Sequence, residues 1–460
     1  MTKNVDDLFG TVAQHRAKTM QLEEAMIGSS GVPALRKRTS NLFRPRERGN
    51  VATLDVQSLD RTLAVDPESM VATVEGMTTY ERFVDACLVH GVVPAVVPEL
   101  KTITVGGAIT GVGIESSSFR HGFVHETVVE MDVLCGDGLV RTCRPDGEHA
   151  DLFHAIPNSY GSLGYVVRAV MRVIPAAEVA LEHVRVADQS AFLDLLASSC
   201  GDSSWDFVEG VLFAPDDHVV TRARFVPGHA QVSRYHGMTP YYRTLLTKSV
   251  DRMSVRDYLW RWDADWFWCS RAFGLEQPVV RFLLKRWMLR SSAYWKILTA
   301  WRRHHLEEKI HAVRKALGLP IHLREPVIQD VEIPFEHCAE FLAFYREKID
   351  IRPCWVCPVI PRSDAKRWTL YSMEPGRLHL NFGFWESVPT SGDLPVDHFN
   401  RLLEREVSRL GGAKSLYSSV HYPRDEFWTI HDEGSYLEVK AKYDPSGRFR
   451  DLWEKVVGRR

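Results

Sequence analysis

The stretch TITVGGAITGVGIESSSFRHG, Thr102 to Gly122, decides the fold of this chain. It holds five glycines and three consecutive serines between two apolar, strand-like segments, VVPAVVPEL and TVVEMDVL. Because glycine lacks a Cβ, its backbone can approach a ligand closely and its N–H groups can bind phosphate oxygens. The spacing is neither a Rossmann fingerprint nor a P-loop, since no G-x-G-x-x-G opens a helix and no Gly-Lys-Ser/Thr follows. From the residues alone, a ligand-binding loop and a set of tight β-turns both remain open.

The composition is that of a soluble globular protein. The 460 residues are 45% hydrophobic and 25% charged, with a net charge of −2. This length favours two or three domains, and this charge gives no general attraction for nucleic acid. No apolar run is long enough to cross a membrane, and the N-terminus lacks the apolar core of a signal peptide. We therefore expect a cytoplasmic location.

The eight cysteines follow no disulfide framework, which is typical of free thiols in a reducing compartment. Cys354 and Cys357 form a CxxC pair, but the β-branched, aromatic run around them predicts a strand. A zinc site needs a second pair with matching spacing, and the sequence has none. We predict no metal site.

Two groups of short strand-like segments are separated by a different middle part. The first half alternates strands with one predicted helix, Thr78–Gly91. The middle begins with VEGVLFAPDDHVVTRARFVP, which predicts a hairpin around Pro215–Asp217. The second group runs through VIQDVEIP, PCWVCPVIP, WTLYSM and LHLNFGFWE. A periodic helix over Phe399–Gly412 follows, and the tail predicts a helix, a turn and a second helix.

The segment 258–303 is rich in tryptophan and basic residues. It holds seven of the 13 tryptophans, and between Arg281 and Arg303 there are seven Lys/Arg and no Asp/Glu. Tryptophan prefers the headgroup region of a bilayer, and each cation near an anionic surface contributes about 1 kcal/mol. We expect RFLLKRWMLR to be an interfacial helix that faces the membrane. The alternative is an ordinary packed helix with a solvated basic face.

Several motifs together carry a family resemblance. VPELKTITVGGAITGVGIESSSFRHG, EMDVLCGDGLV and ADLFHAIPNSYGSLGYVVRAVMRVIPA resemble the FAD-binding, PCMH-type domain of the vanillyl-alcohol-oxidase superfamily. FVEGVLF, PCWVCPVI and YPRDEFW resemble its Δ24-sterol-reductase branch, so the resemblance runs from about Pro33 to the C-terminus. KRTSNLFR and VPELKTITVGGAITGVGIES look closer still to bacterial flavoproteins that are paired with fatty-acid methyltransferases.

The resemblance implies an α+β fold with a split FAD-binding domain and a cap. Residues 1–176 would form the PCMH-type FAD-binding domain of two subdomains. Residues 177–433 would form the cap or substrate domain, whose antiparallel sheet covers the flavin. Residues 434–460 would return to the FAD-binding domain.

The resemblance also implies a noncovalent FAD and the residues that hold it. The first phosphate loop would be Arg38 to Asn41, where Thr39, Ser40 and Asn41 replace the family's usual glycines. The remaining cofactor-binding residues would be Thr104, Val105, Gly106, Gly107, Ala108, Gly111, Gly113, Ser116, Ser117, Gly161, Gly164, Val166 and Lys442. The backbone of the glycine stretch would supply donors to the flavin and pyrophosphate, and Lys442 would stabilise the negative charge of reduced flavin near N1.

Within this branch the implied reaction is reduction of an isolated C=C bond, which requires a hydride and a proton. Candidates for the acid are Glu115 and His125 beside the glycine stretch, and His379, Tyr417 and His421 from the second strand group. We favour Glu115 and His379, because His379 and Asn381 alternate with leucines and should share one face of a strand.

The closest resemblance implies a reductase that converts a 10-methylene fatty-acyl chain of a phospholipid to its 10-methyl form, as in tuberculostearic acid. NADPH or NADH would supply the electrons, and a SAM-dependent fatty-acid methyltransferase would be a partner. The protein would then lie on the inner face of the plasma membrane. A Δ24-sterol reductase, a flavin oxidase or dehydrogenase of an alcohol or sugar, and a flavin-binding protein without turnover are the alternatives.

Overall fold

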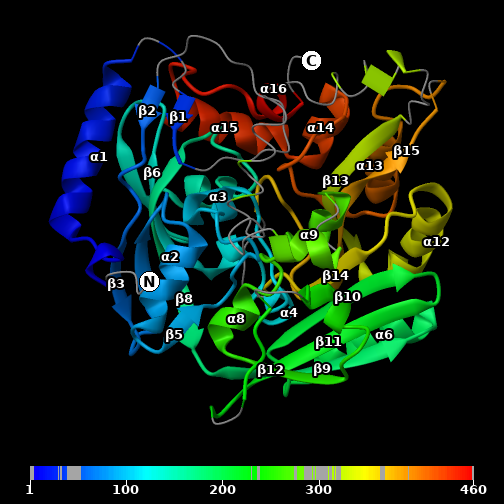
Figure 1. Cartoon of the computed structure of the whole chain (residues 1–460). Helices are drawn as coiled ribbons and strands as arrows, with labels where there is room; N and C mark the ends of the chain where they lie inside the picture. Colours follow the sequence, from blue (N-terminus) through cyan, green and yellow to red (C-terminus); the bar gives the residue numbers. More distant parts are fainter. Residues whose placement is uncertain are drawn as a thin grey trace.

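The computed structural model describes residues 5–29, 31, 34–38, 53–228, 231–235, 239–273, 277–283, 323–362, 368–391 and 393–457, with a few single residues between 293 and 317. Two large sheets lie side by side, one built before residue 176 and one after it (Figure 1). A short parallel pair, β1 (Ala34–Arg36) and β2 (Thr53–Asp55), stands apart from both. The fold is α+β with a PCMH-type domain and a cap, as predicted.

The first sheet has the strand order β3-β4-β8-β6-β7, with β5 added beside β8. Its strands are β3 (Thr62–Asp66), β4 (Val71–Glu75), β5 (Val92–Pro94), β6 (Val128–Leu134), β7 (Val140–Cys143) and β8 (Tyr165–Pro175). Every pairing is antiparallel. The helices of this half are α1 (Val12–Ile27), α2 (Tyr80–Leu88), α3 (Val105–Thr110), α4 (Ser118–His121) and α5 (Ala150–Ala155), with short 3₁₀ turns at Val5–Asp7 and Val124–Thr127.

The second sheet, which we call the cap sheet, has the order β12-β9-β11-β10-β14-β15-β13-β16. Its strands are β9 (Glu178–Val186), β10 (Phe207–Ala214), β11 (Asp217–Val226), β12 (Val250–Met253), β13 (Arg324–Pro334), β14 (Cys354–Val359), β15 (His379–Pro389) and β16 (Ala413–Lys414). All are antiparallel, and β10 and β11 form the predicted hairpin.

Three helices cover the outer face of the cap sheet: α6 (Gln189–Gly201), α12 (Cys338–Lys348) and α13 (His398–Arg409) (Figure 1). They bury a separate apolar cluster that includes Val331, Phe341 and Phe382. Side chains alternate between the faces of a strand, so the partners Cys357, Asn381 and Glu332 belong to the inner face, as does Trp355 two residues before Cys357. That inner face packs toward the first sheet. His379 shares it, which confirms the predicted alternation with Asn381.

The described part of the tryptophan-rich segment is buried at its tryptophans and exposed at Val279, Phe282 and Leu283. It includes α8 (Val255–Leu259), a 3₁₀ turn at Cys269–Phe273 and α9 (Pro278–Leu283), and follows α7 (Tyr241–Thr244). The side chains of Trp260, Trp262, Trp266 and Trp268 are at most 2% exposed. These four tryptophans therefore fill the core instead of facing a membrane. Most of RFLLKRWMLR lies outside the described residues.

The C-terminal helices lie along one end of the molecule, at the top of Figure 1. They are α14 (Arg424–Ile430), α15 (Glu433–Tyr443) and α16 (Leu452–Val456). Separately, a 3₁₀ turn at Phe335–His337 joins β13 to α12. The amide of Gly136 donates to the carbonyl oxygen of Tyr443 over 2.9 Å, and Lys455 Nζ donates to the carbonyl oxygen of Gly161 over 2.8 Å. The predicted helix, turn and helix are confirmed. In contrast WTLYSM, predicted as a strand, forms turns.

Candidate active site

The glycine stretch is a helix where we expected a loop. Residues Val105–Thr110 form α3, and Thr104 caps it by accepting from the amide of Gly107 through Oγ1 over 3.2 Å. A Cβ on Gly106 would stand 3.0 Å from the carbonyl oxygen of Gly76 and 3.1 Å from that of Val166. A Cβ on Gly76 would overlap the same Val166 oxygen. These glycines let α3 sit directly on β4 and β8.

Most amides of this stretch are already used within the protein. Val105 donates to Thr78 over 2.9 Å, Gly106 to Gly76 over 2.8 Å, Ala108 to Thr104 over 2.8 Å and Gly113 to Ala108 over 3.0 Å. The expectation that these N–H groups serve as flavin donors therefore does not match their bonding. Gly107 is exposed and Gly111 is half-buried, so the bare backbone of these two residues is what a ligand can reach.

The serines after the glycines also bond inward. The hydroxyl of Ser116 donates to Glu115 Oε1 over 2.6 Å, and that of Ser117 donates to the carbonyl oxygen of Ala95 over 2.8 Å. Both side chains are at most 1% exposed. Their role here is to fix the chain after α3.

A small basic cleft lies beside the start of α3. Its volume is about 40 Å³, and its lining residues are Lys37, Arg38, Gln57, Asp60, Met77, Thr79, Arg82 and Thr104. Lys37, Arg38 and Arg82 bring positive charge to the cleft, which suits a pyrophosphate, and the cleft adjoins the predicted phosphate loop. Arg38 pairs there with Asp60 over 2.8 Å, and Arg82 pairs with Asp7 over 3.3 Å. Thr39, Ser40 and Asn41 of that loop lie outside the described residues. This arrangement fits the phosphate end of an FAD.

The loop 158–164 joins the two halves of the protein. Asn158 Nδ2 donates to the carbonyl oxygen of Leu370 over 2.9 Å, and its Oδ1 accepts from the amide of Leu416 over 3.3 Å. Gly161 has φ +75°, a conformation that favours glycine. A Cβ on Gly164 would stand 3.0 Å from the carbonyl oxygen of Leu134. The fully buried Ser159 Oγ has no partner among the described residues, so this loop offers a hydroxyl to a ligand.

Lys442 lies on the outside of α15. Its Nζ is 2.8 Å from Asp151 Oδ2, and its side chain is 50% exposed. Hydrogen bonding to Asp151 raises the pKa of Lys442 to about 12. The structure gives this lysine a surface ion pair and does not bring it to the glycine stretch. The buried lysine of this helix is Lys440, which donates to the carbonyl oxygen of Ser162 over 2.8 Å.

Glu115 belongs to a buried charge network centred on Arg261, whose side chain is fully buried. Arg261 Nη2 lies 3.0 Å from Glu115 Oε1 and 2.8 Å from Glu209 Oε2. The indole N–H groups of Trp262 and Trp355 both donate to Glu209 Oε2 over 2.9 Å. The guanidinium also stacks 4.0 Å from the ring centre of Tyr258. The tryptophan-rich segment thus delivers the cation that compensates carboxylates from both halves.

Glu99 completes this network. Burial, together with the nearby charge of Glu115, raises the pKa of Glu99 well above its usual value. Glu99 is 7% exposed, and its Oε1 has no partner among the described residues. The preceding Pro98 lies against Gly113 of the glycine stretch.

A second acidic group lies on the inner face of the cap sheet. Glu332 accepts from the hydroxyl of Tyr371 and from Asn381 Nδ2, the latter over 2.8 Å. Burial raises the pKa of Glu332 to about 7. Its neighbour on the same face, Asp330, also has a raised pKa, because burial and the Glu332 charge oppose its ionisation. At neutral pH this sheet therefore holds protons on carboxyl groups.

The histidine candidates are held in their neutral forms. His379 lies at the end of β15 with Nδ1 3.0 Å from the carbonyl oxygen of Arg377, and burial lowers its pKa. Burial lowers the pKa of His125 to about 3, and burial with the nearby Lys414 and Arg401 does the same for His421. A neutral imidazole is a poor proton donor to an alkene, so these sites favour carboxyl acids.

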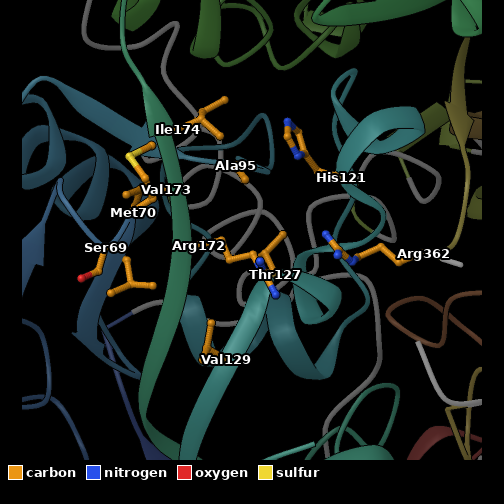
Figure 2. Close-up of a pocket in the computed structure, with 11 residues that line it drawn as sticks. Ser69, Met70, Ala95, His121, Thr127, Val129, Arg172, Val173, Ile174 and Arg362 are labelled. Carbon is orange, nitrogen blue, oxygen red and sulfur yellow. The ribbon is translucent and has the colours of Figure 1, made fainter. Parts of the chain in front are cut away.

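A larger cavity, about 460 Å³, lies elsewhere among the described residues (Figure 2). Figure 2 shows residues of β8 and its neighbours on one side, with His121 and Arg362 on the other. Its described lining includes no residue of Thr102–Ser117 or of the loop 158–164. It borders the end of the glycine stretch through His121 and includes no residue of α3.

Sequence reasoning missed Glu99, Glu209, Arg261 and Glu332. A signal existed for three of them, because Glu99, Glu209 and Glu332 each interrupt an apolar, strand-like run. An ionisable residue in such a run must find a partner or hold its neutral form. Arg261 gave no signal, since it was counted with the basic residues of a segment expected at the surface.

A comparison with known protein families identifies the class of protein to which the chain is similar. Residues 34–144 match the family described as FAD binding domain, which spans the basic cleft, the glycine stretch and most of the first sheet. The chain is an FAD-dependent oxidoreductase.

More specific similarity covers most of the chain. It is 27% identical over 418 residues to the Delta(24)-sterol reductase of Homo sapiens, covering 86% of this chain and 75% of that protein. A Delta(24)-sterol reductase homolog of Caenorhabditis elegans is 24% identical over 441 residues, with 90% and 81% covered. Cytokinin dehydrogenase 7 of Oryza sativa subsp. japonica is 35% identical over 130 residues, 27% of this chain and 25% of that protein.

Proposed function

We propose that this protein reduces a C=C bond of a lipid, with FAD as the hydride carrier and NADPH or NADH as the electron donor. The similarity to Delta(24)-sterol reductases supports the reaction class, because it extends over 86% of the chain and so includes the cap. The observation that carries the proposal is the set of buried carboxyl groups with raised pKa values at the cap–flavin-domain junction. Reduction of an isolated alkene needs such an acid, while oxidation of an alcohol needs a base.

When bound, FAD would supply the hydride. The residues Lys37, Arg38 and Arg82 would hold its pyrophosphate, and Gly107 and Gly111 would let it approach α3. Thr104, Val105, Gly106, Ala108 and Gly113 would shape this surface, and Gly161, Gly164 and Val166 would border it. The aromatic inner face of the cap, including Trp355 and Trp385, would exclude water from the reacting carbons.

We further propose a 10-methylene fatty-acyl chain of a phospholipid as the substrate. The resemblance of KRTSNLFR and of the glycine stretch to flavoproteins paired with fatty-acid methyltransferases supports this choice. A methyltransferase would then supply the methylene lipid, and the protein would work at the inner face of the plasma membrane. No helix in the described parts of the chain has the length and apolarity to span a bilayer. Three of the six residues of α9, Val279, Phe282 and Leu283, are more than 70% exposed and would contact lipid.

Lipid mass spectrometry of cells with and without the gene tests this function. Loss of the gene should accumulate methylene-branched acyl chains and remove their methyl-branched products. A change confined to a sterol with a side-chain double bond would select the sterol substrate instead. Unchanged lipids would overturn the proposal.

A further inference from the structure

Three carboxyl groups and one cation share the interior beside the glycine stretch. Glu99, Glu115 and Glu209 are each at most 7% exposed, and Arg261 is the guanidinium that contacts the last two. Three ionised carboxylates around one buried cation would leave two uncompensated negative charges in a low-dielectric interior. Such charges are strongly unfavourable, so the network retains a proton.

The hydrogen bonds indicate which carboxyl group holds that proton. Glu209 accepts two N–H groups of Arg261 and two indole N–H groups, which suits a carboxylate. Glu115 Oε1 accepts from Arg261 over 3.0 Å and from the hydroxyl of Ser116 over 2.6 Å, which also suits a carboxylate. Its Oε2 has no N–H or hydroxyl donor among the described residues and faces Glu99. A protonated Glu99 carboxyl group would donate its hydroxyl hydrogen to Glu115 Oε2.

Among the acids of the candidate site, Glu99 differs from Glu332 in the bonding of its carboxyl group. Its Oε1 is unpartnered within the described residues, whereas both oxygens of Glu332 accept hydrogen bonds from Tyr371 and Asn381. Glu99 is placed next to the glycine stretch by the contact of Pro98 with Gly113. The glycine stretch is the part of the chain where the backbone is bare to a ligand.

We propose that Glu99 is the catalytic acid of this enzyme, with Glu115 and Arg261 as its positioning residues. This inference rests on the proposed reduction of a lipid alkene. One alkene carbon takes the proton of Glu99 and the other takes the hydride from reduced FAD, so the C=C π bond is replaced by two C–H bonds. Glu99 is left as a carboxylate and regains its proton from solvent before the next turnover. NADPH or NADH supplies the two electrons.

The test separates the two halves of the catalytic cycle. FAD-loaded protein is reduced anaerobically with NADPH, and then mixed with a detergent-dispersed 10-methyleneoctadecanoyl phospholipid or with a sterol carrying a Δ24 double bond. In Glu99→Gln, reduction by NADPH should keep the wild-type rate, while reoxidation by the alkene should slow by about 10²–10⁴-fold. In D₂O, the wild-type product should carry deuterium at the carbon that Glu99 protonates. The N–H hydrogen of reduced FAD also exchanges with solvent, so the other new C–H position does not report on Glu99.

Glu325→Gln is the matched control. Glu325 is also 7% exposed, but it bonds the amides of Phe399 and Asn400 on the outer side of the cap sheet. This variant should reoxidise at the wild-type rate. Glu99→Asp should recover part of the alkene rate, because it keeps an acid with shorter reach.

The outcomes distinguish the proposal from the function on which it rests. Wild-type protein that no lipid alkene reoxidises would overturn the proposed function. If a lipid alkene reoxidises the wild-type protein and the Glu99→Gln variant equally fast, the function stands and Glu99 is excluded as the acid. The same conclusion holds if the reoxidation rate falls comparably only in Glu332→Gln. A Glu99→Gln variant that binds FAD, accepts NADPH electrons and fails with the alkene would support both.

Discussion

Replacing Arg261 with methionine should destabilise the protein strongly, because the guanidinium compensates two carboxylates that no water reaches. Its Nη2 lies 3.0 Å from Glu115 and 2.8 Å from Glu209, and the side chains of all three are at most 1% exposed. Methionine preserves much of the apolar stem but removes every N–H donor. Removing one partner of a buried ion pair costs about 3–5 kcal/mol, since the remaining charge stays buried without compensation. The stack on Tyr258, 4.0 Å from the ring centre, adds to this loss.

The destabilisation should depend on pH with a definite sign. In the variant, a buried carboxylate without its cation takes up a proton more readily than the same group in the unfolded chain. The folded state then holds more protons than the unfolded state, so its stability falls as the pH rises. The free-energy loss should therefore be larger at pH 8 than at pH 5. The double variant Arg261→Met/Glu209→Gln should recover part of it, because one of the two uncompensated charges is gone.

Urea unfolding followed by tryptophan fluorescence measures this effect, with free FAD held at one saturating concentration because bound ligand adds to stability. Trp262 and Trp355 both donate to Glu209, so they report on the network directly. A loss below about 1 kcal/mol at pH 8, or a loss that is the same at pH 5 and pH 8, would refute the reasoning.

Four further predictions concern single sites. Gly106→Ala should lower stability, because its Cβ would meet two backbone carbonyl oxygens. Gly107→Val should lose FAD, as absorbance of the purified protein can show, and should also disturb the cap of α3, because its Cβ would stand 2.8 Å from Thr104 Oγ1. Glu332→Gln should stabilise the protein at pH 8 by up to about 3 kcal/mol and have little effect near pH 4.5, because the pKa of Glu332 in the folded protein is about 7 against an ordinary value of 4.5. Equal urea midpoints of the variant and the wild type at pH 8 would contradict this. Lys442→Met should change stability by less than about 1 kcal/mol and leave the flavin midpoint potential unaltered, because Lys442 is half-exposed and paired with Asp151. A lower potential in the variant would indicate that Lys442 lies near the flavin.

The position of the acids has a consequence for substrate binding. The acidic network lies where α3, the tryptophan-rich segment and β10 meet, while Glu332 lies on β13 of the same cap face. Buried aromatic rings fill the space between, for example Phe267 and Trp385 with ring centres 4.3 Å apart. Under the proposed function, these rings would offer apolar contact to a lipid chain.

The local pattern of the sequence determined the fold class and most of the elements. Alternating apolar residues predicted the hairpin of β10 and β11, periodic ones predicted α13, and the tail was correctly assigned as two helices. The glycine stretch predicted a close approach of backbone to a ligand; what the structure shows is that Gly106, with Gly76, approaches the backbone of Val166 within the protein. These features follow from steric rules that act between neighbours in the chain, so a single sequence contains them.

The tertiary structure alone decided where the charges meet. Glu115 and Arg261 are 146 positions apart in the sequence, and Lys442 and Asp151 are 291 apart. A sequence pattern shows that a side chain is ionisable, but not whether a partner from another element reaches it or whether water does. For that reason Lys442 was expected at the flavin and lies at the surface, while Trp260 to Trp268 were expected at a membrane and fill the core. Burial and long-range pairing set the protonation of Glu99 and Glu332, because only the folded arrangement removes the water that would ionise them.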